Sequence, residues 1–240
     1  MIETNFKFTK KDKVIILTGA GISAESGLKT FRDNNGLWEN HRVEEVATPQ
    51  AFAHNPEMVW KFYKQRYSQL EEVAPNPGHF ALKELEDFCD NNFMLITQNI
   101  DGLHFTAGNK RVLEMHGSLH DCYCSKCNAA FKMKDINLNV MVPKCSDCGG
   151  DLRPDIVWFG EIPYYLNEID LLLKNVNYFI VVGTSGVVQP AASFLYLARM
   201  NGARTIGVNM EAPENMMFID EFHQGASGEI LPKLVKLWSN

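Results

Sequence analysis

A glycine-rich turn directly after an apolar run constrains this chain more than any other feature. Val14 to Leu17 are apolar and predict a short buried strand. The residues 19–24, GAGISA, then fit the pattern G-x-G-x-x-G/A. Gly19 and Gly21 permit a tight turn and let backbone amides approach a pyrophosphate, while Ala24 lets the next helix pack close to the strand. A tight strand-to-helix turn without a ligand would give the same pattern, because short glycine motifs recur by chance.

The stretch after this turn departs from an ordinary dinucleotide-binding unit. Such a unit runs through a helix and a strand to an acidic residue that binds the ribose. Here the next strand-like run begins only at Phe93, and the intervening residues include Phe31, Arg32 and Trp38 on a polar, aromatic, loop-like segment. We therefore expect a nucleotide site that carries its own long lid.

Apolar runs alternate with helical patterns along the rest of the chain. We expect strands at residues 93–97, 112–115, 156–159, 178–182 and 205–209, and helices at residues 57–73, 78–90, 164–174, 190–200 and 230–238. This alternation predicts an α/β fold with a parallel, doubly wound sheet. With 240 residues, the chain suffices for one large domain or for a large and a small one.

Composition excludes several classes of partner. A net charge of −6 gives no sign of a nucleic-acid surface. Apolar runs stay well short of the roughly 20 residues that a membrane helix needs, and the first residues, MIETNFKFTKKDK, lack the apolar centre of a signal peptide. We expect a cytoplasmic protein without nucleic-acid or membrane partners. A monomer is expected, although the sequence does not determine the oligomeric state.

Two C-x-x-C pairs dominate residues 118–152. Cys124 and Cys127 form the first pair and Cys145 and Cys148 the second, with seventeen residues between them. Each pair supplies two thiolates, and together they predict a tetrahedral zinc site. Because four thiolates leave no open coordination position, the zinc should be structural. Cys122 could replace Cys124 as a ligand, but C-x-x-C geometry favours Cys124.

Polar residues follow two of the expected strands. Gln98, Asn99 and Asp101 come directly after residues 93–97, where open α/β sheets bind ligands. Turn and helix-cap chemistry explains them equally well. His116 follows the next strand, precedes a glycine, and is a candidate general base because its ordinary pKa lies near neutrality. Five other histidines, at positions 41, 54, 79, 120 and 223, are interpreted as structural.

Taken in order, these motifs resemble the sirtuin family of NAD-dependent protein lysine deacylases. The motifs are GAGISAESG with Phe31-Arg32, TQNIDGLH, His116-Gly117, the two C-x-x-C pairs, VWFGE at 157–161 and Gly183-Thr184-Ser185. The resemblance runs from about Val14 to Leu234. It implies a Rossmann-like domain of residues 1–38, 76–117 and 154–240 with helices on both faces. It also implies a small domain with a helical part, 39–75, and a zinc-binding module, 118–153.

The resemblance also implies the site residues. His116 would be the base and Asn99 a second catalytic residue. NAD, consumed as a co-substrate, would contact Gly19, Ala20, Gly21, Ala24, Phe31, Arg32, Trp38, Gln98, Asn99, Ile100, Asp101, Gly183, Thr184, Ser185, Asn209, Met210, Glu211 and Ala226. The substrate peptide would pair with Val157, Trp158, Phe159, Gly160 and Glu161 as an added strand. The products would be nicotinamide, free lysine and O-acyl-ADP-ribose.

Tyr63 and Arg66 carry the information on the acyl group. They are three residues apart on an expected helix and so share a face. The planar guanidinium of an arginine matches a carboxylate, and a phenol can add a hydrogen bond. The pair resembles the Y-x-x-R signature of sirtuins that remove succinyl and malonyl groups, and the small Ala24 is consistent with a wide acyl pocket. We expect desuccinylation, demalonylation and deacetylation of protein lysines. Without the family context, an ordinary helix edge would be the preferred interpretation.

Three alternatives stay open on the sequence. The same NAD site could support mono-ADP-ribosyl transfer. A binding module that reads NAD or acyl-lysine without turnover is a second possibility, although the intact His116 and Asn99 argue against it. A zinc-bearing dehydrogenase is a third, and it would reduce NAD, whereas a deacylase would not.

Overall fold

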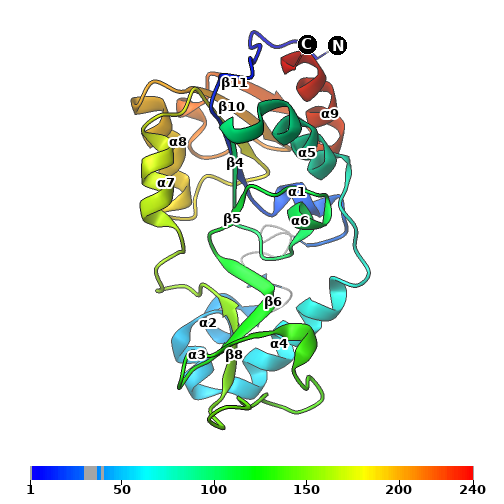
Figure 1. Cartoon of the computed structure of the whole chain (residues 1–240), viewed down its shortest axis with the longest axis vertical. Coiled ribbons are helices and arrows are strands. Elements are labelled where there is room, and N and C mark those ends of the chain that lie inside the picture. The colour runs from blue at the N-terminus through cyan, green and yellow to red at the C-terminus, as the bar shows by residue number, and fades with distance from the viewer. Residues whose placement is uncertain (1, 30–36, 39–40, 240) are drawn as a thin grey trace.

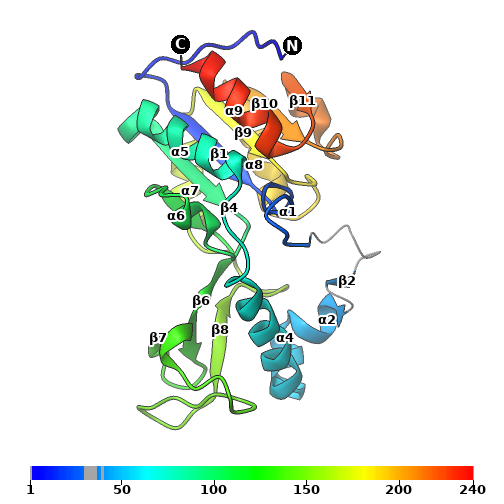
Figure 2. The same ribbon diagram turned by 90° about the vertical axis from the view of Figure 1, so that its right-hand side faces the viewer.

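The computed structural model describes residues 2–29, 37–38 and 41–239. In these residues the molecule is elongated, with a large parallel sheet at one end and a smaller part at the other (Figures 1 and 2). Strand β6 (Gly117–Cys124) leads from the large part into the small one. The large part contains both chain ends, which lie close together at the top of Figure 1.

The large sheet has six strands in the order β11-β10-β9-β1-β4-β5, and every pairing is parallel. The strands are β1 (Val14–Thr18), β4 (Phe93–Thr97), β5 (Val112–Glu114), β9 (Tyr178–Val182), β10 (Arg204–Asn209) and β11 (Glu221–Gln224). From central β1 the chain first builds outward through β4 and β5, then returns to build β9, β10 and β11 on the other side. This order confirms the doubly wound, Rossmann-like sheet and places its switch point between β1 and β9.

Both faces of this sheet are covered, because successive residues of a strand point to opposite sides. Val14 and Ile16 pack in the core under α5 (Pro77–Cys89) and α9 (Ser227–Trp238). Ile15 and Leu17 pack in the core under α7 (Leu166–Leu173) and α8 (Ala191–Met200). All five residues of β1 are buried, which explains why the strand is a continuous apolar run rather than an alternating one.

The small part combines helices with a three-stranded antiparallel sheet in the order β7-β6-β8. Its elements are α2 (Val43–Val46), α3 (Pro49–His54), α4 (Pro56–Gln69), β6, β7 (Ala130–Lys132) and β8 (Leu152–Ile156). Helix α4 connects two cores: Val59, Phe62 and Tyr63 pack with α2 and α3, whereas Trp60 packs among the cysteine-rich loops. Asn55 caps its first turn by accepting from the backbone N–H of Met58 at 3.1 Å.

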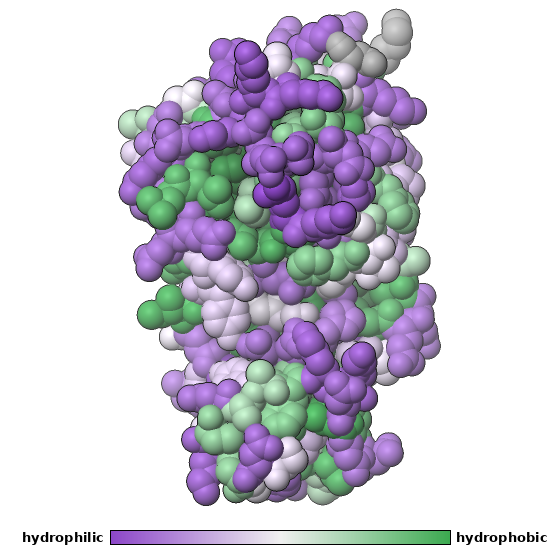
Figure 3. Space-filling view, in the orientation of Figure 1, coloured by the Kyte–Doolittle hydropathy of each residue, from purple (hydrophilic) through white to green (hydrophobic). Residues whose placement is uncertain are grey.

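The remaining elements are short. They are α1 (Gly21–Ala24), β2 (Leu37–Trp38), β3 (His41–Arg42), α6 (Leu103–Thr106), and the 3-10 turns η1 (Asp90–Asn92), η2 (Met133–Asp135) and η3 (Met216–Phe218). On the face shown in Figure 3, polar residues predominate and apolar ones are interspersed. Within the described residues, none of the helices has the length and apolar character to cross a membrane.

One expectation about the strands is corrected. The strand expected at residues 156–159 is wrong: β8 ends at Ile156, because its antiparallel partner β6 begins at Gly117, which pairs with that residue. The helix expected after the glycine turn is present as a single turn, α1. The segment after it turns back at Gly27, whose φ of 96° is a backbone conformation that favours glycine.

Candidate active site

A cavity of about 900 Å³ lies at the carboxyl ends of β1, β4 and β9 and continues toward α4. It brings together nearly all the described residues that were predicted to bind NAD or substrate. From the large part these are Gly19, Ala20, Gly21, Ala24, Gln98, Asn99, Ile100, Asp101, His116, Gly183, Thr184, Ser185, Asn209, Met210 and Glu211. From the smaller part and its junction they are Tyr63, Arg66, Val157, Trp158, Phe159, Gly160 and Glu161.

The glycines of the turn after β1 are required by the neighbouring loop. A Cβ on Gly21 would lie 2.6 Å from the Cα of Gly183, and one on Gly19 would lie 2.8 Å from the carbonyl oxygen of Gly183. The amide of Gly21 donates to that same oxygen at 2.8 Å, and the amide of Gly19 donates to Val182 O at 3.0 Å. These two amides are thus used to join the loops at the switch point. That other backbone amides of this turn approach a pyrophosphate stays a prediction.

A largely buried polar network forms part of the cavity wall. The amide nitrogen of Asn99 donates to Ser23 Oγ at 3.1 Å, and the Ser23 hydroxyl donates to Asp101 Oδ2 at 2.7 Å. The other oxygen of Asp101 accepts the backbone N–H of Leu103 at 2.9 Å. Burial raises the pKa of the Asp101 carboxyl, while these two hydrogen bonds oppose the shift. Asn99 is held in one orientation because its amide is anchored to this chain of bonds.

The ring of His116 is oriented by the backbone of the neighbouring strand end. Its Nδ1 lies 3.0 Å from the carbonyl oxygen of Gln98, and a carbonyl can only accept. Nδ1 therefore carries the proton in the neutral ring, which leaves Nε2 as an acceptor. Burial lowers the pKa of His116, and the bond to Gln98 partly offsets that effect. The ring is thus kept neutral and able to take up a proton at Nε2.

The end of the cavity at α4 is formed by aromatic and basic side chains. Tyr63 is fully buried, Arg66 is 6% exposed, and the guanidinium carbon of Arg66 lies 5.3 Å from the ring centre of Phe62. Trp158, from the segment after β8, donates its indole N–H to the Tyr63 hydroxyl at 2.9 Å. The expected shared face of Tyr63 and Arg66 is confirmed, since both line the same cavity.

Glu161 lies at the cavity wall but uses its carboxylate within the protein. Its two oxygens accept from Arg153 at 2.7 and 2.9 Å. Oε2 also accepts the backbone N–H of Trp158 at 2.8 Å. These bonds shape the turn at residues 158–161 and lower the pKa of Glu161 against the opposing effect of burial.

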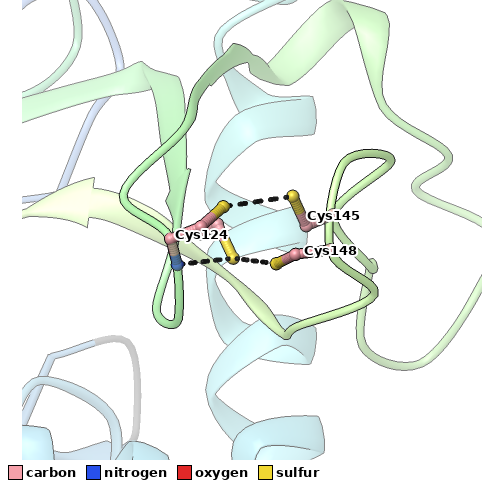
Figure 4. A group of neighbouring side chains, drawn as sticks. Cys124, Cys145 and Cys148 are labelled. Carbon is pink, nitrogen blue, oxygen red and sulfur yellow. Dashed lines mark hydrogen bonds between the residues drawn. The ribbon is translucent and has the colours of Figure 1, made fainter.

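Four thiols form the second site, in the small part. The sulfurs of Cys124, Cys127, Cys145 and Cys148 all lie within 4.8 Å of one another, with Cys124 and Cys148 at 3.4 Å and Cys127 and Cys145 at 3.7 Å. Figure 4 shows Cys145 and Cys148 on one loop, directed across to Cys124. Sulfurs bound at about 2.3 Å around a tetrahedral zinc are separated by similar distances. The residues therefore fit a four-thiolate zinc site.

Neighbouring atoms agree with this ligand set. Backbone N–H groups of Lys126 and Cys127 lie 3.4 and 3.5 Å from Cys124 Sγ, as in a metal-binding knuckle, where they stabilise thiolate charge. Cys122 instead places its thiol 3.7 Å from the carbonyl of Phe131. Cys122 thus lies outside the four-thiol cluster, in agreement with the preference for Cys124 as the ligand.

The sequence profile of the Sir2 family matches residues 19–190, which is more than half of the chain. The chain belongs to the Sir2 family. Two curated relatives, both named NAD-dependent protein deacylase, are similar over nearly their whole lengths. The one from Bdellovibrio bacteriovorus is 48% identical over 92% of this chain and 94% of its own. The one from Pasteurella multocida is 46% identical over 93% of this chain and 97% of its own. The resemblance seen in the motifs is thereby confirmed.

Solved Sir2 structures share the whole fold. A mutant Sir2 homologue in complex with 2′-O-acetyl ADP-ribose superposes with a TM-score of 0.87 at 40% identity, covering 95% of this chain and 92% of its own. A Sir2 protein described with a p53 peptide and NAD⁺ has a TM-score of 0.83 at 31% identity, covering 93% and 92%. The agreement extends over the sheet and the small part together, because the coverage is nearly complete.

Some expected contacts of this Sir2 protein are not brought to the cavity or cannot be placed. Ala226 caps α9 and does not line the cavity. The N-terminus of α9 is held by Glu25, whose Oε1 accepts the Ser227 hydroxyl at 3.0 Å and the Gly228 amide at 2.8 Å. Phe31 and Arg32 lie outside the described residues. Trp38 belongs to β2, but its side chain is not described.

One residue of the cavity lining, Ser23, is not indicated by the sequence, and a second residue, His79, supports it from behind. Ser23 occupies a variable position of the glycine pattern, and its importance appears only through its bonds to Asn99 and Asp101. His79, interpreted as structural, packs behind Ser23: its Nε2 lies 3.5 Å from Ser23 Oγ, and burial lowers its pKa to about 4. The fold brings His79 to Ser23 from a distant helix start, so no local motif could have indicated the contact.

Proposed function

We propose that this chain is an NAD-dependent protein lysine deacylase that accepts acidic acyl groups as well as acetyl. The observation that carries the proposal is the single cavity, which joins His116 and the glycine loops at the sheet edge to Tyr63 and Arg66 on α4. NAD occupies the sheet end, and the acyl-lysine enters so that its acyl group points toward α4. The names of the curated relatives favour deacylation over ADP-ribosyl transfer.

His116 is the general base. When bound, NAD supplies an electrophilic ribose carbon from which nicotinamide departs. The chain's contribution is to remove a proton from a ribose hydroxyl, and Nε2 of His116 is the acceptor because Nδ1 is occupied by Gln98 O. The lowered pKa of His116 keeps this acceptor available at neutral pH.

Asn99 and Asp101 position the ribose end. Asn99 is held through Ser23 to Asp101, so the three side chains form a rigid polar wall. Rigid donors and acceptors lower the cost of orienting the reactants. Asn99 has its nitrogen bonded to Ser23, which directs the amide oxygen of Asn99 away from that bond.

Tyr63 and Arg66 recognise the acyl carboxylate. Arg66 is almost fully buried and presents a planar donor fork, and a carboxylate that enters a buried site needs such a partner. The small Ala24 lines the same cavity and leaves space beside the acyl chain. Desuccinylation, demalonylation and deacetylation are all proposed activities of this site.

The segment 157–161 contacts the substrate peptide through its backbone. Its side chains at Trp158 and Glu161 are engaged within the protein, while Phe159 is 50% exposed. The amide of Val157 donates to His116 O and that of Phe159 to Ala47 O, both at 2.9 Å, so the segment is fixed at the rim. The proposal also includes a division into a Rossmann-like domain and a small domain. It further includes a monomeric state and a cytoplasmic location.

One assay tests it. A single peptide carrying acetyl-, succinyl- or malonyl-lysine is incubated with and without NAD, and the mass of the peptide and of the ADP-ribose product are measured. We expect NAD-dependent loss of each acyl group and appearance of O-acyl-ADP-ribose. ADP-ribosylated protein without peptide deacylation would indicate mono-ADP-ribosyl transfer instead. An unchanged peptide in all three reactions would contradict the proposal.

A further inference from the structure

The hydrogen bond between Trp158 and Tyr63 sets the direction of the Tyr63 hydroxyl. The indole N–H can only donate, so the phenol oxygen accepts this bond at 2.9 Å. The phenol keeps its own proton to donate in another direction. Both side chains are almost completely buried, at 2% and 0% exposure, so water does not compete freely for this bond. The two side chains also line the cavity that contains Arg66.

The Trp158 ring is itself held from two sides. The guanidinium carbon of Arg153 lies 3.5 Å from the centre of the indole ring, a stacked cation–π contact. Phe52 packs against the indole with ring centres 5.4 Å apart. Arg153 is fixed in turn by its two bonds to Glu161 and by a bond from Nη2 to Ile156 O at 2.9 Å. The indole therefore has little freedom to turn its N–H away from Tyr63.

We propose that Trp158 is a positioning residue for acyl recognition: its N–H occupies the phenol oxygen of Tyr63, so that the Tyr63 O–H is donated to an acyl carboxylate beside Arg66. This inference rests on the proposed removal of acidic acyl groups. A hydrogen bond received by the phenol oxygen also makes its O–H a stronger donor, because bonds in a chain polarise one another. An acetyl group has no carboxylate, so it gains nothing from this arrangement.

The ion pair between Arg153 and Glu161 keeps a second cation near the acyl end from binding the substrate. Arg153 lies against Trp158, close to the acyl end, and it could attract a carboxylate away from Tyr63 and Arg66. Glu161 accepts from both terminal nitrogens of Arg153, so the positive charge of Arg153 is paired inside the cavity wall. Arg153 thereby supports the indole without competing for the substrate.

The test compares Trp158→Phe with wild type on one peptide carrying either succinyl- or acetyl-lysine. The phenylalanine keeps an aromatic ring and removes the donor. We expect kcat/KM for the succinyl peptide to fall on the order of fivefold more than for the acetyl peptide, chiefly through KM, as for loss of one hydrogen bond. The same substitution is then made in a Tyr63→Phe background. There it should change the succinyl-to-acetyl ratio by less than about twofold, because Trp158 acts through the missing hydroxyl.

Trp60→Phe is the matched control. Trp60 is also fully buried, also donates its indole N–H, to Leu152 O at 2.8 Å, and packs away from the cavity in the cysteine-rich core. It should alter both activities in the same proportion. If Trp158→Phe fails to fold, Arg153→Lys provides the second variant. Lysine loses the stacked fork, and the succinyl-to-acetyl ratio should fall in the same direction.

The outcomes separate the two proposals. A wild-type protein that removes acetyl but not succinyl groups contradicts the acidic-acyl function and this inference with it. A wild type that removes both, combined with equal losses on both peptides in Trp158→Phe, overturns the positioning role alone. A ratio change that is as large in the Tyr63→Phe background as in wild type overturns it as well.

Discussion

Nδ1 of His116 lies 3.0 Å from the backbone carbonyl oxygen of Gln98. This contact fixes the tautomer, so Nε2 is the basic atom. His116→Ala should therefore lower kcat by roughly 100- to 10,000-fold, the usual range for loss of a general base. Steady-state rates on an acetyl-lysine peptide measure the effect. His54→Ala changes an exposed histidine that does not line the cavity, so it serves as the control and should keep wild-type rates. A His116→Ala enzyme with a tenth of wild-type kcat would exclude the base role.

The pKa of His116 should set the pH dependence of the reaction. The base must be unprotonated, and burial lowers the pKa of His116 below its ordinary value of 6.5. As pH falls, the neutral form therefore persists past 6.5, and the acid limb of kcat/KM should have its midpoint below that value. A pH profile from 5 to 9 measures the midpoint. A midpoint above 6.5 would mean that the lowered pKa does not govern the reaction.

Arg66 should separate the acyl groups. Arg66→Met removes the donor fork and keeps a long apolar stem, so desuccinylation should fall about 100-fold more than deacetylation, as expected for a charged partner lost from a buried site. Lys64→Met is the matched control. Lys64 also carries a cation on α4, but it bonds to the carbonyls of Val140 and Met141 outside the cavity lining. Its ratio of succinyl to acetyl kcat/KM should equal that of wild type. Equal losses on both peptides for Arg66→Met would remove the carboxylate role.

Glu114 should make stability depend on pH. Burial, together with the nearby charges of Asp101 and Asp121, raises its pKa from 4.5 to about 7. A raised carboxyl pKa contributes stability that is complete below pH 4.5 and is lost as pH rises through about 7. Glu114→Gln stays neutral throughout. Its free energy of unfolding relative to wild type should thus increase by roughly 2 to 3 kcal/mol between pH 5 and 8. Urea unfolding at both pH values gives the difference, and a constant difference would contradict the assigned shift.

Gly21 should be needed for the packing of its turn against Gly183, even without NAD. A Cβ at Gly21 would meet the backbone of Gly183 at 2.6 Å, and backbone atoms cannot move aside as a flexible side chain can. Gly21→Ala should lower the free energy of unfolding by roughly 1 to 3 kcal/mol, as for other overpacked sites. The loss should appear in urea unfolding without NAD. A variant with wild-type stability that is defective only in NAD binding would show that the glycine serves the phosphates.

The sequence predicted the parts of the fold that rest on local patterns. Strands β1, β4 and β9 are buried between two helical layers, so each is an uninterrupted apolar run that can be recognised without the structure. The elements α2, α3, β6 and β7 were not predicted. They are short or polar, and their packing depends on distant partners such as Trp60 and on the four thiols.

The residues of the candidate site also fall into two groups: those that local sequence patterns predict and those that only the fold brings together. Motif residues such as His116 and the cysteines were found because their types and spacing limit the possible chemistry. Contacts between distant segments were not found. Ser23 meets Asp101 because β1 and β4 lie side by side in the large sheet, and Trp158 meets Tyr63 because the segment after β8 packs against α4. A lone serine or tryptophan carries no sequence signal of its partner.

The four-thiol cluster should bind the zinc on which folding of the cysteine-rich loops depends. A zinc ion held by four thiolates links two loops whose small apolar cluster is built partly from the thiols themselves, so its removal should unfold that region. Cys148→Ala should bind less than half the zinc of wild type and melt at a lower temperature. Cys122→Ala is the matched control, since Cys122 lies in the same strand as the ligand Cys124 but contacts Phe131 O instead of the cluster. It should keep one zinc per chain. Zinc content by elemental analysis and thermal melting measure both variants, and equal zinc in the two would refute the assigned ligand set.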